Sequence, residues 1–145
     1  MTLRKIFTEE ELIQAYDEFA DSIFRHCYLR TNDRDLSKDL TAETFRHLWA
    51  FASYGNVIDS VKIFLYRRID SLIKERRLVE KRLATVTRSD PAGYLTTIPS
   101  EERKLCVLHF VDGFSAEEIC TMFGGSADAL LKKLHELNTR FLLSS

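Results

Sequence analysis

Apolar residues recur at intervals of three and four positions along most of the chain, which is typical of amphipathic helices. Thr8 stands at the start of the first such stretch, with Glu11 at capping-box spacing after it. The apolar positions that follow are Leu12, Ile13, Tyr16, Phe19, Ile23, Phe24 and Cys27. The pattern predicts one helix that ends near Thr31-Asn32 and buries this stripe in a core.

Two more helices are predicted before the middle of the chain. Asp33 or Asp35 can cap the second helix, and Tyr54-Gly55-Asn56 breaks the chain after it. The apolar positions of the second helix are Leu36, Leu40, Phe45, Leu48, Trp49 and Phe51. Asp59 or Ser60 can start the third helix, whose apolar face consists of Val61, Phe64, Leu65, Ile69, Leu72 and Ile73. Three such helices in succession predict a bundle.

The periodicity lapses from about Ala84 to Thr97, where Pro91 and Gly93 mark a loop. It resumes at Ser100, which can cap a helix that closes at Asp112-Gly113. The apolar positions of this helix are Leu105, Leu108 and Val111. We therefore expect a helical domain in residues 1–83, a linker in 84–97 and a second domain in 98–145.

The second domain contains a helix-turn-helix pattern. Ser115-Ala-Glu-Glu118 has capping-box spacing and opens a short helix that stops at Gly124-Gly125. Its inward positions are Ile119, Met122 and Phe123. Ser126 can cap the last helix, whose apolar positions are Leu130, Leu131, Leu134, Leu137 and Phe141. Helix, tight glycine turn and helix predict the motif, and the whole chain is predicted to be all-α.

Composition excludes several classes of protein. The sequence of 145 residues contains no apolar run long enough for a signal peptide or a membrane span, so we expect a cytoplasmic protein. It contains no phosphate-binding loop, nucleophile elbow or HExxH pattern, which predicts no enzyme activity and no cofactor. The three cysteines form no CxxC pair and are interpreted as buried thiols. A metal site on His26-Cys27 or on Cys106, His109 and Cys120 is the alternative, and we expect no metal.

Charge is distributed unevenly along the chain, although its net value is only −1. Residues 1–61 carry seven Lys and Arg against eleven Asp and Glu, and residues 99–145 carry five against seven. Residues 62–88 carry nine against three, a net charge of +6. Only this middle segment has the charge expected of a nucleic-acid contact.

Two stretches carry a resemblance to a known family. Asp39-Leu-Thr-Ala-Glu-Thr-Phe45 precedes Leu48-Trp49, and Arg103 to Ile119 runs RKLCVLHFVDGFSAEEI. These are similar to the DLxQETFxxxW and REVLLLRxxEGLSxEEIA patterns of the extracytoplasmic-function group of bacterial sigma factors. The family is built from a promoter-melting helical domain and a helix-turn-helix domain, and the resemblance covers most of the chain.

In that family the helix with the DLxQETF pattern docks on core RNA polymerase. The resemblance therefore implies a polymerase contact at Asp39, Leu40, Glu43, Phe45 and Trp49. Carboxylates around an apolar anchor suit a partner with basic side chains. The alternative is that Leu40, Phe45 and Trp49 are ordinary core residues and that the two acidic residues only form a solvated face.

The resemblance also implies that the third helix and the loop before it contact the downstream promoter element. The residues available for this are Tyr54, Asn56, Lys62, Arg67, Arg68, Lys74, Arg76 and Arg77. Alternatively, these charges only solvate an exposed helix. Arg68-Ile-Asp-Ser-Leu72 stands where the family has IARNL, so Asp70 and Ser71 alter this contact.

For the upstream element, the resemblance points to the last helix. The residues available there are Ser126, Lys132, Lys133, His135 and Arg140. Asp128, Leu131 and Glu136 depart from the family's VGTVKSRLHRA, and Gly125 replaces an apolar residue in the turn. Added negative charge opposes the approach of a helix to phosphates, so these departures reduce the DNA contacts available.

The leading hypothesis is an alternative sigma factor that binds core RNA polymerase and promoter DNA, is a monomer when free, and has an anti-sigma factor as a further partner. The second hypothesis is a divergent sigma-like regulator that binds polymerase or a protein partner without reading promoters. Asp70, Asp128, Leu131 and Glu136 are the features that favour it, and it gains if the last helix exposes an acidic or apolar face. A third hypothesis, a free-standing helix-turn-helix repressor or activator, predicts a stable dimer.

Overall fold

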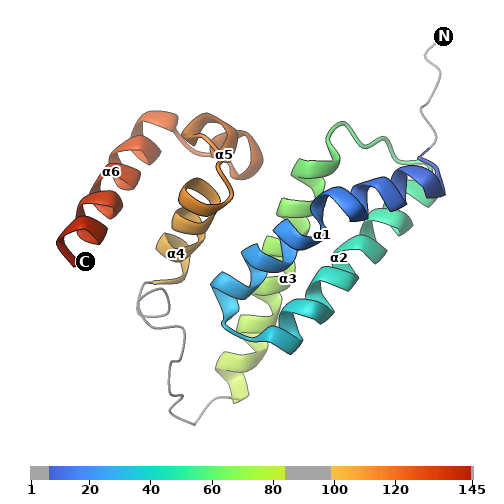
Figure 1. Ribbon diagram of the computed structural model, residues 1–145, viewed down its shortest axis with the longest axis horizontal. Coiled ribbons are helices and arrows are strands. Elements are labelled where there is room, and N and C mark those ends of the chain that lie inside the picture. The colour runs from blue at the N-terminus through green and yellow to red at the C-terminus, as the bar shows by residue number, and fades with distance from the viewer. Residues whose placement is uncertain (1–6, 84–98, 145) are drawn as a thin grey trace. The chain divides into compact units, whose positions relative to one another are not determined.

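The computed structural model describes residues 7–83 and 99–144, with only the backbone described for residues 79–83 and 140–144. Every regular element in these ranges is a helix, which confirms the all-α prediction (Figure 1). The chain divides into two compact units between residues 89 and 90. The predicted linker, residues 84–97, lies outside the described residues. Within the described ranges, no helix has both the length and the apolar composition needed to cross a lipid bilayer.

The first unit is a bundle of α1 (Glu9–Thr31), α2 (Arg34–Ser53) and α3 (Val61–Leu83), in which each helix contacts the other two. The Thr8 hydroxyl caps α1 by accepting a hydrogen bond from the Glu11 N–H at 3.2 Å. Asn32 ends α1 in the left-handed conformation, with φ of 55°. Asp33 then caps α2, accepting from the Leu36 N–H at 2.9 Å. This two-residue turn makes α1 and α2 antiparallel neighbours.

The start of α3 at Val61 is set by the residue that caps it. The Ser60 hydroxyl accepts a hydrogen bond from the Ile63 N–H at 3.2 Å, so Ser60 rather than Asp59 caps the helix. Leu65, Ile69 and Ile73, at spacings of four, are completely buried from this helix. They pack in the core with residues such as Ile23 of α1 and Leu48 of α2, which are equally inaccessible.

One part of the sequence prediction for α1 is wrong. The apolar stripe was expected to be core along its whole length, yet Ile13 is 60% and Tyr16 52% exposed, whereas Ile23 is fully buried. α3 contacts α1 at His26 and Arg30, in the second half of α1. The first half of the stripe is therefore left open to solvent, and only a tertiary contact could have distinguished the two halves.

The second unit contains α4 (Ser100–Cys106), a π-helical turn η2 (Val107–Val111), α5 (Ala116–Phe123) and α6 (Ala127–Ser144). Its core is formed by Val107, Leu108, Phe114, Ile119, Met122, Leu134 and Leu137. The ammonium group of Lys104, on α4, lies 3.7 Å from the centre of the Phe123 ring, on α5. This cation–π contact joins the two helices inside the unit.

Two details of the predicted helix in this unit are corrected. Pro99 occupies the N-cap position with no side-chain capping bond, and Ser100 is already the first helical residue. The Asp112 N–H bonds to the Val107 carbonyl at 2.8 Å, five residues back, so the helix ends in a π turn. The wider turn leaves Val111 exposed and Val107 buried, although a regular 3.6-residue period had placed Val111 inward.

α5 and α6 are joined by the glycine turn that the sequence predicted. Ser115 and Glu118 form a complete capping box, with both hydrogen bonds at 3.1 Å. Gly124 and Gly125 follow with φ of 87° and 99°, a conformation that residues with a Cβ rarely adopt. Ser126 precedes α6, and its hydroxyl accepts from the Ala129 N–H at 3.5 Å. The two glycines thus set the turn between the helices.

Candidate partner and nucleic-acid surfaces

The α2 residues assigned to polymerase divide between the surface and the core. Asp39 is exposed and Glu43 half-buried, and they lie one turn apart on the outward face of α2. A Glu43 carboxylate oxygen lies 3.6 Å from Nε2 of His47. Leu40 is only 2% exposed and Phe45 6%, so neither side chain is presented on the outward face of the helix. Of the three apolar residues, only Trp49 is half-buried rather than buried.

A groove with a volume of about 650 Å³ runs between the open half of α1 and the C-terminal half of α2. Its lining residues are Leu12, Ile13, Tyr16, Ala42, Phe45, Arg46 and Trp49. The Tyr16 ring meets Phe45 edge-on, with the centroids 5.0 Å apart. The apolar periodicity predicted that these α1 residues are core, so the sequence did not indicate a groove. Their apolar character was visible in the sequence, but their exposure was not.

The cations of α3 do not gather on one face. Arg67 and Arg76 are both exposed but lie nine residues apart, which is about two and a half helical turns, so they point to opposite sides. Arg67 and Lys74, seven residues apart, lie on the same side. Lys62, also exposed, is 14 residues from Arg76 and lies on the side of Arg76. The basic segment therefore cannot act as one stripe along a phosphate backbone.

Two of the predicted DNA-contacting cations take part in contacts within the bundle. An Arg77 guanidinium nitrogen donates to the carbonyl oxygen of Arg30, at the end of α1, with a distance of 2.7 Å. The Lys74 ammonium lies 3.3 Å from a carboxylate oxygen of Asp70. Arg77 thereby ties α3 to α1, and Lys74 neutralises charge on its own helix.

Asp70 has a different role from the one that its position in the family pattern suggested. It was expected to alter the contact of this helix with the downstream element, but it is buried. Its carboxylate lies 2.9 Å from the guanidinium of Arg30, which has no exposed surface. His26 Nε2 lies 3.2 Å from the same guanidinium, and the His26 ring packs edge-on against Tyr66. Asp70 is therefore a structural residue between α1 and α3.

An aromatic group lies beside the loop that was predicted to contact the downstream promoter element. Tyr54 is 87% exposed at the end of α2, and the Asn56 amide donates to the Phe51 carbonyl at 3.0 Å. The Phe51 ring packs against Phe64 at 5.2 Å between centroids, and Arg68 lies over Phe64 at 5.4 Å. Tyr54 offers a ring face for stacking, whereas Asn56 is held by the helix end.

The last helix exposes a mixed surface. Outward positions of α6 include Asp128, Leu131, Lys132, His135 and Glu136, and Leu131 is 54% exposed. These side chains carry two carboxylates against one ammonium group.

Two of the other residues assigned to the upstream element, Lys133 and Ser126, take part in contacts within the second unit. The Lys133 ammonium is held by Glu102 of α4 at 2.7 Å. Ser126 caps α6, and the side chain of Arg140 lies outside the described ones. The side chains described on α6 thus carry two carboxylates, Asp128 and Glu136, and two ammonium groups, Lys132 and Lys133, so this helix has no excess of basic charge.

The cysteines and histidines do not form a metal site in the parts of the chain that the structure describes, where no three His, Cys, Asp or Glu residues cluster as ligands. Cys27 and Cys106 are buried, and Cys120 is half-buried. Burial raises the pKa of the Cys27 thiol above its ordinary value of 9.0, which keeps the thiol protonated. His109 Nδ1 lies 2.7 Å from the Phe114 carbonyl oxygen, and this hydrogen bond stabilises the turn after η2.

Comparison with known proteins identifies the fold. No protein-family model matches the sequence, and no curated protein matches it. Among solved structures, the chain is similar to the sigma factor RpoE of Bartonella quintana, in its co-crystal structure with the anti-sigma factor NepR. The TM-score is 0.71 over 90% of this chain and 94% of that chain, with 15% sequence identity. The protein therefore has the fold of a sigma factor.

Proposed function

We propose that this protein is an alternative sigma factor of the extracytoplasmic-function type, which binds core RNA polymerase and directs it to promoters. The similarity of its fold to the sigma factor RpoE, over 90% of the chain, is the observation that carries the proposal. Two helices of the first unit carry suitable surface residues for this role: acidic and aromatic side chains on α2, and cations on α3. The role needs no catalytic residue and no bound cofactor.

The proposed polymerase contact is the outward face of α2. Asp39 and Glu43 present carboxylates one turn apart, and Trp49 presents an aromatic ring further along the helix. Carboxylates steer a basic partner and fix its register, while a partly buried aromatic residue provides the anchor. Leu40 and Phe45 hold this helix in the bundle and contribute indirectly.

The proposed downstream DNA contact is narrower than the sequence suggested. Arg67 is exposed on one side of α3 and can meet phosphates, and Tyr54 can stack on an unpaired base. Lys74 lies on the same side of α3 as Arg67 but is paired with Asp70. Arg68 extends this surface from its position over Phe64. Strand separation would draw on polymerase binding and base stacking without nucleotide hydrolysis.

The outward face of α6 favours a second candidate function. Asp128, Glu136 and the exposed Leu131 suit a protein contact better than a phosphate-lined groove, and Lys133 is held by Glu102. A sigma-derived regulator that binds polymerase without reading the upstream element would have this surface. Asp70 no longer favours this candidate, because it is buried against Arg30.

Regulation by an anti-sigma protein belongs to the same proposal. The structurally similar RpoE was crystallised with the anti-sigma factor NepR. We expect this chain to have such a partner and to be monomeric in its absence.

Run-off transcription with core RNA polymerase from the same organism tests the leading proposal. Asp39→Lys with Glu43→Lys should weaken polymerase binding, because it reverses charge on the outward face of α2. Glu18→Lys with Glu75→Lys makes the same change of charge at exposed positions elsewhere and should leave polymerase binding intact. A chain that never binds polymerase would contradict the proposal of a sigma factor.

The DNA contact is tested in the same assay. Tyr54→Ala and Arg67→Glu should lower promoter opening while polymerase binding is retained. Arg76→Glu is the matched control for Arg67→Glu, because it makes the same charge change on the opposite side of α3. Equal loss in the two arginine variants would argue against a defined DNA surface on α3.

The two candidate functions differ in what α6 does. If α6 reads the upstream element, Lys132→Glu should abolish initiation at promoters that depend on this element. If the wild type binds polymerase but initiates at no selected promoter, and Asp128→Lys with Glu136→Lys creates DNA binding, the regulator is the correct interpretation.

A further inference from the structure

We infer that His26 makes the contact between the end of α1 and the middle of α3 sensitive to acid, because a proton on its imidazole opposes the Arg30–Asp70 pair. His26 is only 1% exposed and lies on the second half of α1. The three residues belong to the first unit, so the inference does not depend on how the two units are arranged. It goes beyond the proposed role in transcription, which assigns no contact with polymerase or DNA to His26.

The hydrogen bond between His26 and Arg30 fixes the protonation of the imidazole. Nε2 of His26 lies 3.2 Å from Nη1 of Arg30. A guanidinium group has only donors, so Nε2 accepts this hydrogen bond and the ring is neutral. A proton on Nε2 would remove the acceptor and bring two cationic donors face to face.

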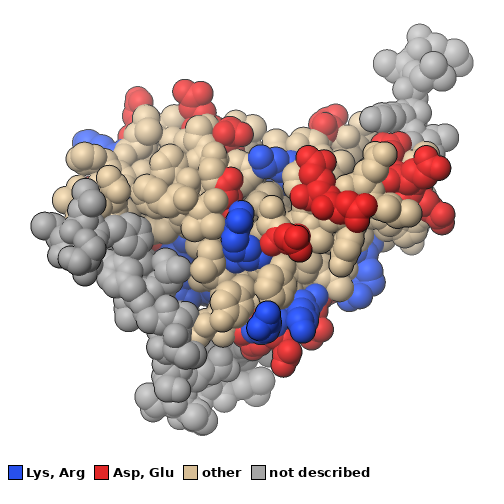
Figure 2. All heavy atoms as spheres, viewed as in Figure 1, with Lys and Arg blue, Asp and Glu red and all other residues tan. Residues whose placement is uncertain are grey.

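The buried charge beside His26 is already balanced. The Arg30 guanidinium lies 2.9 Å from the carboxylate of Asp70, which is the only buried acidic side chain among those that the structure describes. The other carboxylates described in the first unit are exposed or half-buried, and Figure 2 shows several of them gathered over the first half of α1. A protonated His26 would therefore share one buried carboxylate with Arg30, and an uncompensated buried charge is costly.

The charged groups that α3 contributes add to this cost. The Lys74 ammonium lies 3.3 Å from the second oxygen of the Asp70 carboxylate, so part of the negative charge is already engaged. An Arg77 guanidinium nitrogen donates to the carbonyl oxygen of Arg30 at 2.7 Å and brings a further cation to the end of α1. The printed contacts of the network thus contain three cations and one carboxylate before His26 binds a proton.

The neutral groups around His26 offer no charge that would stabilise a proton. The ring of Tyr66, on α3, meets the imidazole edge-on, with the centroids 5.3 Å apart. Cys27, the next residue on α1, stays protonated because burial raises the pKa of its thiol. The residues that α2 buries are apolar, serine or threonine, so this helix contributes no buried charge.

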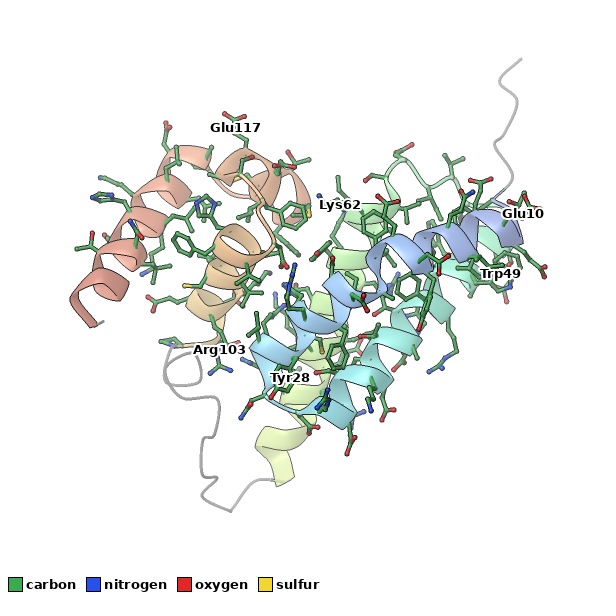
Figure 3. All side chains as sticks on the ribbon, in the orientation of Figure 1. Glu10, Tyr28, Trp49, Lys62, Arg103 and Glu117 are labelled. Carbon is green, nitrogen blue, oxygen red and sulfur yellow. The ribbon has the colours of Figure 1, made fainter. Side chains whose placement is uncertain are left out.

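The position of the network determines which part of the bundle is loosened. His26 and Arg30 lie at the end of α1, one turn apart, with Tyr28, which Figure 3 labels, between them in the sequence. On α3, Asp70 and Arg77 are about two turns apart, and both hold Arg30. A weaker Arg30–Asp70 pair should therefore free the second half of α3 from α1.

The direction of the effect follows from the number of protons that each state binds. A histidine in the unfolded chain takes up its proton near pH 6.5, whereas His26 in the folded bundle does so only at lower pH. Below about pH 6.5 the unfolded state therefore binds one more proton, and the folded state loses stability as the pH falls. The unfolding equilibrium constant should rise by up to about tenfold for each pH unit in this range.

The test is urea unfolding of the full chain between about pH 7.5 and pH 5, a range that spans the titration of histidine. The readout is the fluorescence of Trp49, the single tryptophan, which lies in the first unit. His26→Gln keeps an oxygen that can accept from Arg30 but cannot be protonated, so it should abolish most of this pH dependence. His47→Gln is the matched control and should leave it in place, because a proton on His47 would favour its pairing with Glu43.

Two measurements on the wild type do not require a variant that folds. The His26 ring resonance, assigned by its contact with the Tyr66 ring, should not shift above the pH at which the bundle begins to unfold. Hydrogen exchange, corrected for the intrinsic effect of pH, should show protection in the second half of α3 falling before protection in α2.

Three results would overturn the inference. The first is a His26 resonance that titrates near pH 6.5 in the folded protein, as in an unfolded chain. The second is a pH dependence of unfolding that is the same in His26→Gln as in the wild type. The third is exchange protection that falls equally in α2 and in the second half of α3. None of these measurements involves polymerase or DNA, so a failure here is separate from a failure of the proposed function.

Discussion

The guanidinium of Arg30 and the carboxylate of Asp70 lie 2.9 Å apart inside the first bundle, and they join the end of α1 to the middle of α3. Arg30 has no exposed surface, and the Asp70 side chain has almost none. A buried charge that loses its partner is costly, whereas replacement of both partners by apolar residues is often tolerated. A substitution at either residue is therefore tolerated only together with a matching substitution at the other, although the two are 40 positions apart in the sequence.

Asp70→Ala should lower the free energy of unfolding by about 3–5 kcal/mol, because it leaves the Arg30 charge buried without its carboxylate. The measurement is urea unfolding followed by far-UV circular dichroism. Lys74→Ala is the control, since its ion pair with Asp70 is half-exposed and worth less than about 1 kcal/mol. Arg30→Met with Asp70→Leu should recover most of the loss. If Asp70→Ala costs no more than Lys74→Ala, the buried pair does not have the structural role assigned to it.

Ile13 and Ile23 belong to the same apolar stripe of α1 but should respond differently to truncation. Ile23→Ala creates a cavity in the core and should cost about 2–5 kcal/mol. Ile13→Ala removes an exposed side chain and should change stability by no more than about 0.5 kcal/mol. Unfolding by urea measures both variants. Similar costs would mean that the first half of α1 is covered in solution.

The three thiols should react in a fixed order. Cys120 is half-buried, whereas Cys27 and Cys106 are almost inaccessible. Alkylation of the native protein should therefore modify one thiol rapidly and all three only in denaturant. Cys120→Ser should remove the rapid phase, as counted by mass spectrometry. A rapid phase that survives this substitution would show that one of the buried thiols is accessible.

Cys27 also predicts a dependence of stability on pH. Its pKa is raised in the folded protein, so the folded state keeps the proton when the unfolded thiol begins to ionise near pH 9.0. The contribution of the protonated Cys27 thiol to folding stability is therefore fully present below pH 9.0 and is lost as the pH rises above this value. Cys27→Ala should make the free energy of unfolding fall less steeply above this pH. An unchanged slope in Cys27→Ala would contradict the raised pKa.

Gly125 should resist substitution because its φ is 99°. An added Cβ meets no neighbouring atom, so the cost comes from the backbone conformation rather than from crowding. Gly125→Ala should lower the free energy of unfolding by about 1 kcal/mol. Gly125→Asn should cost less, because asparagine tolerates positive φ better than alanine. Calorimetry of the full chain measures both, and equal costs would argue against a strained backbone as the cause.

Much of the local structure follows from the sequence alone. Thr8 and Asp33 cap the helices that they were predicted to cap, and Ser115 with Glu118 forms the predicted capping box. Caps and apolar periodicity depend on residues within one or two turns of each other, so no tertiary information is needed to recognise them. The resemblance to sigma-factor patterns pointed to the same fold that the structure has.

The sequence by itself thus determined the helices and the fold class, whereas the tertiary structure decided which side chains are available to a partner. Ile13 and Ile23 have the same place in the periodicity, and only the packing of α3 exposes one and buries the other. Asp70 lies on a helix rich in basic residues, but its carboxylate is buried because it pairs with Arg30 of α1. The candidate surfaces could not be predicted in full because exposure depends on contacts between segments distant in sequence, which periodicity does not encode.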